Sequence, residues 1–266
     1  MDFLPALPDG NSFGLILESR NLRADNKETT LAITDKTSEF YDQLTLNWEV
    51  SNPLGYFEWF KGRMKERYNI RKNAIAESYK IDIEDVPDYK IKTSLQKAIQ
   101  ILKRHRDIYF KDNLEKRVSS VIISTLAAHA YNGNSSLTET LLELTKNMKT
   151  YIIKTGNEYQ ITNPVNPVEN FADKWNNNDD LAIAFRNWIK LAHQDIIDII
   201  NGEDNIFENI EIKDKYIEKF GKKSFNNAFG KSLKKYEEKF GKKSGIIAGT
   251  TAISRVSKPY GGDCHN

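Results

Sequence analysis

The chain has 266 residues, of which 39% are hydrophobic and 11% aromatic, which is enough for one large domain or two smaller ones with a packed core. No run approaches 18 consecutive apolar residues and no basic-then-apolar leader is found, so we expect neither a membrane span nor a secretory signal. The net charge of +2 conceals a basic stretch at residues 212–243, where eleven lysines stand against four acidic residues.

The first fifty residues are predicted to be rich in β-strand. The runs DFLPALP, SFGLILE and ETTLAIT are short, apolar or alternating, and they are bounded by Asp, Gly and Asn turn signals. Asp2 is the one carboxylate among the apolar residues of the first run. From Ser51 onward the pattern becomes helical, and Pro53 suits the first position of a helix. The sequence therefore predicts an α+β protein that is mostly α-helical.

Several further segments carry a helical pattern. The clearest is TSLQKAIQILKRHRDIYF, where Thr93 and Gln96 form a capping box and the apolar residues fall on one face. SSVIISTLAAHAY is apolar nearly all round, so we expect a central, buried helix there. Two more helices are predicted in SLTETLLELTKNMKTYII and DDLAIAFRNWIKLAHQDIIDII. Between them, the two Asn-Pro pairs of NPVNPVENFADKW exclude regular helix.

The basic C-terminal stretch contains a repeated motif. EKFGKKS occurs at residues 218–224 and again at 238–244. Two copies are too few for a solenoid, so we interpret them as the ends of two basic amphipathic helices, closed by Gly221 and Gly241.

Isolated chemical signatures in the sequence are weak. The four histidines are far apart and lack metal-ligand spacing, and His129 on the apolar helix is interpreted as a core residue. The single cysteine, Cys264, has no partner for a disulfide or a CxxC site, which favours a reducing cytoplasm. An acidic cluster is either a metal site or a solvated loop, and we favour the loop; it consists of Asp82, Glu84, Asp85 and Asp88.

A basic group in the capped helix has two interpretations. Lys103, Arg104 and Arg106 are either a solvated helix face or a clamp for phosphate, since lysine and arginine supply ionic hydrogen bonds to phosphate oxygens. Spacing alone does not decide between them.

The order of several long motifs is more specific than any of these signatures. KTSLQKAIQILKRHRDIYF, SSVIISTLAAHAY and NPVNPVENFADKW follow one another with gaps that resemble the C-terminal part of the bacterial cGAS/DncV-like nucleotidyltransferases (CD-NTases) of CBASS antiphage defence. WEVSNPLGYFEWF and DFLPALPDG resemble the middle region of the same family. The resemblance implies residual strands of a polymerase-β-like palm sheet at 1–50 and an oligoadenylate-synthase-like helical nucleotide-binding domain at 51–205. A basic helical tail would follow at 206–266.

The resemblance also implies an activity and a set of site residues. Members of the family join nucleoside triphosphates, ATP, GTP or others, into cyclic di- or trinucleotide second messengers, and three carboxylates hold two Mg²⁺ ions. Asp2 matches the third carboxylate, as a catalytic and metal-binding residue. Lys103 matches a lysine that contacts the donor triphosphate, and Ser120 matches a serine that hydrogen-bonds the same phosphates. Arg106 is a further nucleotide-binding candidate, with a structural ion pair to a carboxylate as the equal alternative.

Part of the family's metal site is not found in the sequence. There is no Gly-Ser dipeptide and no pair of acids before Asp2. Because one carboxylate cannot hold two Mg²⁺ ions, we expect this chain alone to be inactive. It would be the C-terminal portion of a broken gene or of an enzyme whose first half is a separate chain.

Two functions of other classes stay open. The first is a non-catalytic nucleotide- or RNA-binding protein that uses the basic helices, although the leading hypothesis involves neither nucleic acid nor a membrane. The second is a structural partner of an effector, in which the terminus SRVSKPYGGDCHN attaches to a CBASS regulatory protein.

Overall fold

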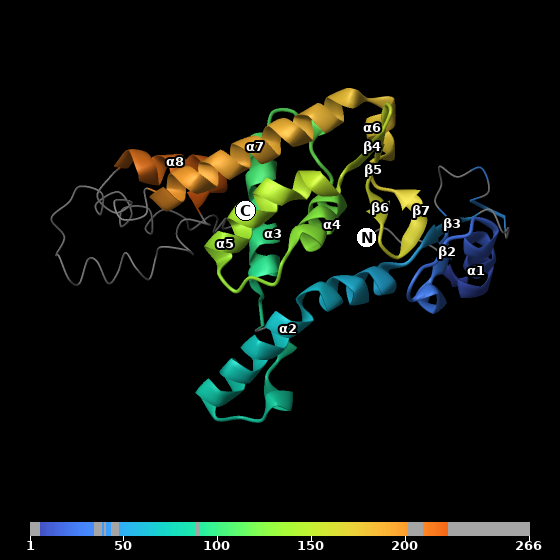
Figure 1. Ribbon diagram of the computed structural model, residues 1–266, viewed down its shortest axis with the longest axis horizontal. Helices are drawn as coiled ribbons and strands as arrows, with labels where there is room; N and C mark the ends of the chain where they lie inside the picture. The colour runs from blue at the N-terminus through green and yellow to red at the C-terminus, as the bar shows by residue number, and fades with distance from the viewer. Residues whose placement is uncertain are drawn as a thin grey trace, which may run out of the picture. The chain divides into compact units, whose positions relative to one another are not determined.

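The structure is a computed structural model that describes residues 6–34, 39, 41–43, 48–88, 91–201 and 210–222. Figure 1 labels its elements in chain order. The chain divides into two compact units, Met1–Gln194 and Asp195–Asn266. Helices dominate the described residues and the strands are short and antiparallel, so the expected α+β fold is confirmed. Within the described ranges, no helix is both long enough and apolar enough to cross a membrane.

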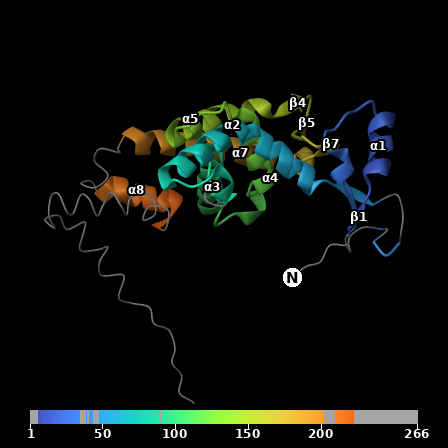
Figure 2. The ribbon, with the colours of Figure 1, turned by 90° about the horizontal axis from the view of Figure 1, so that it is seen from below.

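The N-terminal region forms a small antiparallel sheet. Its strands are β1 (Ala6–Pro8), β2 (Leu31–Ile33) and β3 (Glu49–Ser51), in the order β1-β2-β3. Ala32 lies opposite Leu7 on one side and Val50 on the other. Helix α1 (Gly10–Ser19) and the 3-10 turn η1 (Lys27–Thr29) connect β1 to β2, and both views of the ribbon show α1 beside the strands (Figures 1 and 2).

The strand expected for the run SFGLILE is wrong, because these residues belong to α1. Phe13 and Leu17, four residues apart, are 1% and 3% exposed, whereas Leu15 between them is 68% exposed. A seven-residue apolar run is compatible with a buried strand as well as with a helix. Here the core covers only one side of the segment, and a helix places the two buried residues on that side.

Helix α2 (Pro53–Tyr79) begins as expected, with Pro53 at its first position. The buried Asn52 side chain caps it, because its Oδ1 accepts a hydrogen bond from the Gly55 amide at 2.9 Å. The Asn52 side chain also contacts the segment around η1. Its Oδ1 accepts a hydrogen bond from the Thr29 hydroxyl at 2.7 Å, and its Nδ2 donates to the Asn26 carbonyl at 2.8 Å. Asn52 thus ties the start of α2 to the segment before β2.

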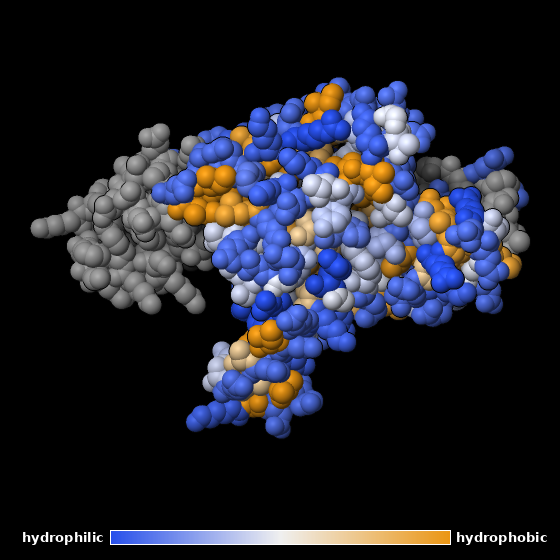
Figure 3. All heavy atoms as spheres, viewed as in Figure 1, coloured by the Kyte–Doolittle hydropathy of each residue, from blue (hydrophilic) through white to orange (hydrophobic). Residues whose placement is uncertain are grey.

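The far end of α2 carries a small hydrophobic cluster of its own. The 3-10 turn η2 (Ile83–Asp85) leads the chain back along the helix, and Val86 and Ile91 pack against Ala76. Ile81 and Ile83 remain more than 40% exposed, and Figure 3 shows hydrophobic atoms on the surface of this part of the molecule.

The main core is helical. Helices α3 (Ser94–Tyr109), α4 (Ser120–Ala130) and α5 (Leu137–Asn147) pack against one another, and α7 (Asp179–Asn201) follows later in the chain. The predicted capping box of Thr93 and Gln96 is present at the start of α3. The apolar stripe of α3 and most of α4 are buried, as expected. The fully buried side chains of α3, α4 and α5 include Leu95, Leu102, Ile123, Leu126 and Leu144.

Two hairpins that the sequence did not indicate join this core to α7. They are β4 (Ile153–Thr155) with β5 (Glu158–Gln160), and β6 (Thr162–Asn163) with β7 (Asn166–Asn170). The two Asn-Pro pairs lie in the β6–β7 hairpin, as the exclusion of helix predicts. The last three residues of the NPVNPVENFADKW segment are an exception, because helix α6 (Asp173–Asn177) begins there. The 3-10 turns η4 (Leu114–Lys116) and η5 (Met148–Tyr151) complete the connections between helices.

In the second unit, helix α8 (Ile210–Phe220) ends at a glycine, as the first EKFGKKS motif predicts. Gly221 has φ +83°, and its amide donates to the Ile217 carbonyl at 2.8 Å. Gly241, in the second motif, lies outside the described residues.

Candidate functional site

An open groove of about 300 Å³ lies where α2, α3 and α4 meet. The lining residues are Tyr56 and Phe60 from α2, Ser124 from α4, Gln96, Ile99, Gln100 and Lys103 from α3, and Lys92 just before α3. Two of them are lysines and none is a carboxylate, so the groove suits an anionic ligand with an apolar part.

Lys103 is half-buried on α3, and its ammonium group is in an unfavourable environment. Burial lowers the pKa of Lys103, the nearby Arg106 charge lowers it further, and Asp107 opposes both. An anion placed in the groove would compensate the buried charge, so the position favours binding of a phosphate.

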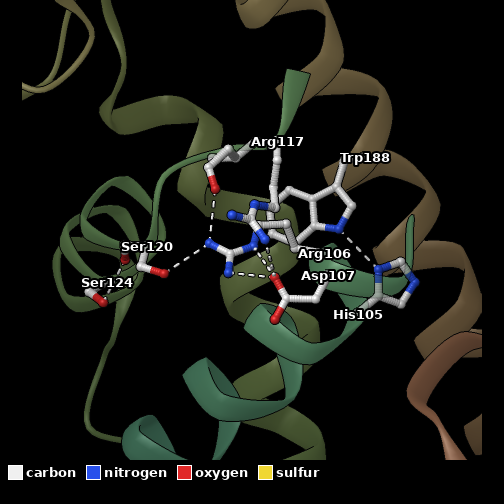
Figure 4. A network of polar contacts seen from close by, with 8 residues as sticks. His105, Arg106, Asp107, Arg117, Ser120, Ser124 and Trp188 are labelled. Carbon is white, nitrogen blue, oxygen red and sulfur yellow. Dashed lines mark hydrogen bonds and ion pairs between the residues drawn. The ribbon is translucent and has the colours of Figure 1, made fainter. Parts of the chain in front are cut away.

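Arg106, one turn along α3, is 6% exposed, and each nitrogen of its guanidinium donates a hydrogen bond (Figure 4). Nη2 pairs with the Asp107 carboxylate at 2.6 Å, so the structural ion pair given as the alternative for Arg106 is present. Nη1 donates to the carbonyl of Val118 and to the hydroxyl of Ser120, both at 2.9 Å. Arg106 thereby fixes the start of α4 against α3.

Ser120 is the first residue of α4 and is exposed. Its hydroxyl accepts a hydrogen bond from Arg106, which leaves its own proton to donate to an acceptor such as a phosphate oxygen. The preceding Ser119 caps the helix by accepting from the Ile122 amide at 3.4 Å, so Ser120 is not needed as the cap. Figure 4 shows the Ser120 hydroxyl directed toward the guanidinium.

The structure thus connects the predicted phosphate residues without placing all of them in the groove. Lys103 lines it, whereas Ser120 lies one turn before the lining residue Ser124, whose hydroxyl donates to the Ser120 carbonyl at 2.9 Å. The positive end of the α4 dipole lies at Ser120.

The aromatic wall of the groove was not predicted. Tyr56 and Phe60 are four residues apart on α2, a spacing that the sequence displays but that does not by itself indicate a ligand. The Tyr56 hydroxyl shares a 2.9 Å hydrogen bond with Thr125 of α4. Burial raises the pKa of Tyr56, and the bond to Thr125 opposes this shift. Tyr56 therefore contributes a neutral phenol in a fixed orientation to this wall.

A larger depression, of about 760 Å³, lies between α1, β3 and β7. Its lining mixes charges of both signs, with Arg20 and Lys174 beside Glu49 and Glu169. This mixture is less suited to a highly charged anion than the carboxylate-free groove at Lys103.

Known proteins resemble this chain over part of their length. No protein-family model matches it. A c-di-GMP synthase from Roseivirga ehrenbergii is 33% identical over 169 residues, which are 63% of this chain and 42% of the relative. The cyclic dinucleotide synthase CdnG from Bradyrhizobium diazoefficiens is 34% identical over 100 residues, 35% of this chain and 24% of the relative. The chain therefore spans less than half the length of these curated relatives.

A solved structure, the CD-NTase CdnG of Bradyrhizobium diazoefficiens in complex with GTP, has a similar fold. The TM-score is 0.52 at 19% identity, over 78% of this chain and 61% of that chain. The chain is a relative of the CD-NTases. The resemblance seen in its motifs is confirmed.

The described part of this CD-NTase relative does not contain a metal site. Across the described ranges no three His, Cys, Asp or Glu side chains are grouped to hold a metal ion. Asp2, predicted to be the third carboxylate, lies outside the described residues. The residues present therefore do not by themselves fit a pair of Mg²⁺ ions.

The acidic cluster before α3 is a solvated segment, as favoured from the sequence. Asp82, Glu84 and Asp85 are exposed, and Asp88 accepts a hydrogen bond from the Tyr68 hydroxyl. The cluster has the role of a loop in this CD-NTase relative, with one local phenol–carboxylate pair.

His129 has a packing role but is half-buried rather than fully buried, which corrects the expected core position. Its ring stacks on Tyr151 at 5.6 Å and lies 5.1 Å from Trp59. Burial lowers the pKa of His129, and the Arg63 charge adds to the shift. The neutral ring is therefore favoured in the folded protein.

Proposed function

We propose that this chain is the C-terminal portion of a nucleotidyltransferase that makes cyclic di- or trinucleotide second messengers from nucleoside triphosphates. The observation that carries the proposal is the groove at Lys103, which combines two lysines and an aromatic wall and has no carboxylate in its lining. The names of the curated relatives, c-di-GMP synthase and cyclic dinucleotide synthase, support the same reaction class.

Each predicted residue has a distinct role in this proposal. Lys103 contacts the triphosphate with its ammonium group, and a bound phosphate offsets the cost of burying that charge. Ser120 donates its hydroxyl proton to a phosphate oxygen. Arg106, whose donors are directed to Asp107, Val118 and Ser120, positions the Ser120 hydroxyl instead of meeting the nucleotide directly.

The metal-dependent step requires carboxylates that the described residues do not supply. We propose Asp2 as the third carboxylate of a Mg²⁺ site on the basis of the motif around it. The sequence contains no Gly-Ser motif followed by an acid pair. The chain tested alone is therefore proposed to bind nucleoside triphosphates without joining them.

The setting that we propose is bacterial CBASS antiphage signalling in the cytoplasm. We propose that residues 1–50 form palm strands, that residues 51–205 form a helical nucleotide-binding domain and that residues 206–266 form a basic tail. A regulatory partner is proposed to bind at the C-terminus.

The test measures binding and synthesis separately. Isothermal titration of this chain with GTP and ATP should show binding that is weakened in Lys103→Met. Joining the chain to the reading frame upstream of Met1 should then yield a cyclic dinucleotide from mixed triphosphates, identified by mass spectrometry. If the chain binds no triphosphate but binds RNA in a salt-dependent way that is lost when residues 206–266 are deleted, the RNA-binding alternative replaces this proposal.

A further inference from the structure

Two cationic side chains from different elements converge on one phenol oxygen. Lys154 of β4 and Arg186 of α7 each place a nitrogen, Nζ and Nη2, 3.1 Å from the hydroxyl oxygen of Tyr159. Tyr159 lies on β5 directly opposite Lys154, and the residue is 2% exposed. Both cations, by contrast, lie on exposed residues.

The phenol is held firmly in place. The Asn176 side chain pairs with the Tyr159 backbone as a neighbouring strand would, because its Oδ1 accepts from the Tyr159 amide at 2.7 Å and its Nδ2 donates to the carbonyl at 3.2 Å. The ring meets Trp175 edge-on, with a centroid distance of 6.0 Å. The hydroxyl therefore has a fixed position between the hairpin and α7, beneath the exposed residues Lys154 and Arg186.

The two positive charges have no carboxylate partner among the described residues. Neither Lys154 nor Arg186 takes part in an ion pair found among the described residues. Both instead contact Tyr159, at its hydroxyl and at the face of its ring. The nitrogens are also close together, since both lie within hydrogen-bond distance of the same oxygen. A neutral phenol compensates two neighbouring cations only weakly, by its lone pairs and its ring quadrupole.

The arrangement leaves several donors that point to the same place. The Tyr159 oxygen accepts from both cations, so its own proton is free to donate, and no acceptor for it occurs among the described residues. Unused N–H groups of the ammonium and the guanidinium complete a set of donors from β4, β5 and α7. A tetrahedral oxyanion can accept from three such directions at once, and a phosphate monoester carries enough charge for two cations.

We propose that Lys154, Tyr159 and Arg186 form a binding site for the phosphate group of a small molecule. The site shares no residue with the groove at Lys103, which α2, α3 and α4 line, so it is additional to the proposed triphosphate site. The purely structural interpretation is that the two cations pack on the ring and hold the hairpin against α7, without a ligand.

In the experiment, the full chain is titrated with inorganic phosphate, which replaces chloride so that the ionic strength stays constant. The titration uses a Lys103→Met background, which removes the phosphate contact proposed for the groove. Binding is followed by backbone amide NMR shifts and by the thermal unfolding midpoint. Lys154→Gln and Arg186→Gln should each weaken phosphate binding about tenfold. Tyr159→Phe keeps the ring and should weaken binding severalfold, whereas Lys146→Gln, an exposed lysine on α5, should leave the affinity unchanged.

Two further titrations distinguish the sources of the phosphate. A nucleoside monophosphate that binds more tightly than inorganic phosphate, with the same dependence on Arg186, assigns the site to nucleotides; equal affinities assign it to free phosphate. Saturable phosphate binding that survives the Lys154→Gln/Arg186→Gln double variant, or no saturation in the parent chain, overturns the proposal. The proposal is also overturned if a single-stranded oligonucleotide binds and neither inorganic phosphate nor the nucleoside monophosphate does. GTP binding is measured separately in chains that keep Lys103. If Lys154→Gln and Arg186→Gln leave it unchanged, a negative phosphate result does not count against the proposed triphosphate groove.

Discussion

Replacing Lys103 by methionine tests the central element of the proposed function. Methionine keeps the unbranched apolar stem that lies in the groove and removes only the ammonium group. Because burial and the Arg106 charge lower the pKa of Lys103, its charge gives no net stabilisation that the fold depends on. We therefore expect the free energy of unfolding of Lys103→Met to equal or exceed that of the parent chain.

The effect on binding should be much larger. Hydrogen bonds to charged groups contribute about 1.5–3 kcal/mol, and each 1.4 kcal/mol is a factor of ten in Kd. The Kd for GTP should therefore rise about 10- to 100-fold. In the parent chain, binding should also weaken as the pH rises toward the lowered pKa of Lys103, and this alkaline loss should be absent from the variant.

The assay is isothermal titration with GTP, accompanied by urea unfolding of each protein. Lys97→Met is the matched control: Lys97 lies on the same helix, its pKa is also lowered, first by burial and then by Arg71 and Lys92, and it does not line the groove. Its Kd should change less than about threefold, because only long-range attraction is lost. Equal weakening in both variants would show that GTP responds to the general positive field of α3, and the assignment of Lys103 would be refuted.

Four further predictions concern stability and pH. Arg106→Gln should lower the free energy of unfolding, measured in urea, by about 2–3 kcal/mol, because the buried carbonyl of Val118 loses its hydrogen-bond donor. Arg106→Lys should not restore the stability, because an ammonium group cannot bond to Val118 and Asp107 at once as the planar guanidinium does. The hydrogen bond from Tyr68 lowers the pKa of Asp88 below 3.8, so its stabilisation is present above that pH and is lost on acidification; the difference in unfolding midpoint between parent and Asp88→Asn should vanish in acid. Burial, with help from Asp88, raises the pKa of Tyr68 to about 12. The tyrosinate absorbance of the parent chain should therefore include a late-ionising phenol whose pKa falls in Asp88→Asn. The lowered pKa of His129 means that the folded protein binds fewer protons, so stability should fall as the pH drops below 6.5, and His129→Phe should reduce this slope in pH-dependent unfolding.

Local signals made much of the helical fold predictable. Pro53, the Thr93–Gln96 capping box and Gly221 act within one turn of their own helices, and the structure places each where the sequence indicated. The run SFGLILE was misjudged because its period is ambiguous, and only the side on which the core lies determines that Phe13 and Leu17 share a buried helix face.

Several of the missed features depend on contacts between distant residues. Strand β5 pairs with β4, but its Tyr159 amide also donates to the side chain of Asn176, 17 residues away, which no strand pattern reveals. The link from Arg106 to Ser120 crosses 14 residues and joins two residues that were predicted separately by one hydrogen bond. The groove wall at Tyr56 likewise depends on the hydrogen bond to Thr125, which exists only once α2 and α4 are packed.

The Asn52 amide has a consequence for how segments of this protein can be exchanged. One side chain serves both as the cap of α2 and as the partner of Thr29 and Asn26, so a crossover between residues 51 and 53 would separate groups that complete one another. A hybrid that receives α2 from a homologue without a compatible asparagine would lose about 1 kcal/mol from the cap alone, and its η1 turn would lose the amide as well. Recombination is therefore expected to transmit the segment from Asn26 through η1, β2, β3 and the first turn of α2 as one inherited block, with viable junctions later in α2.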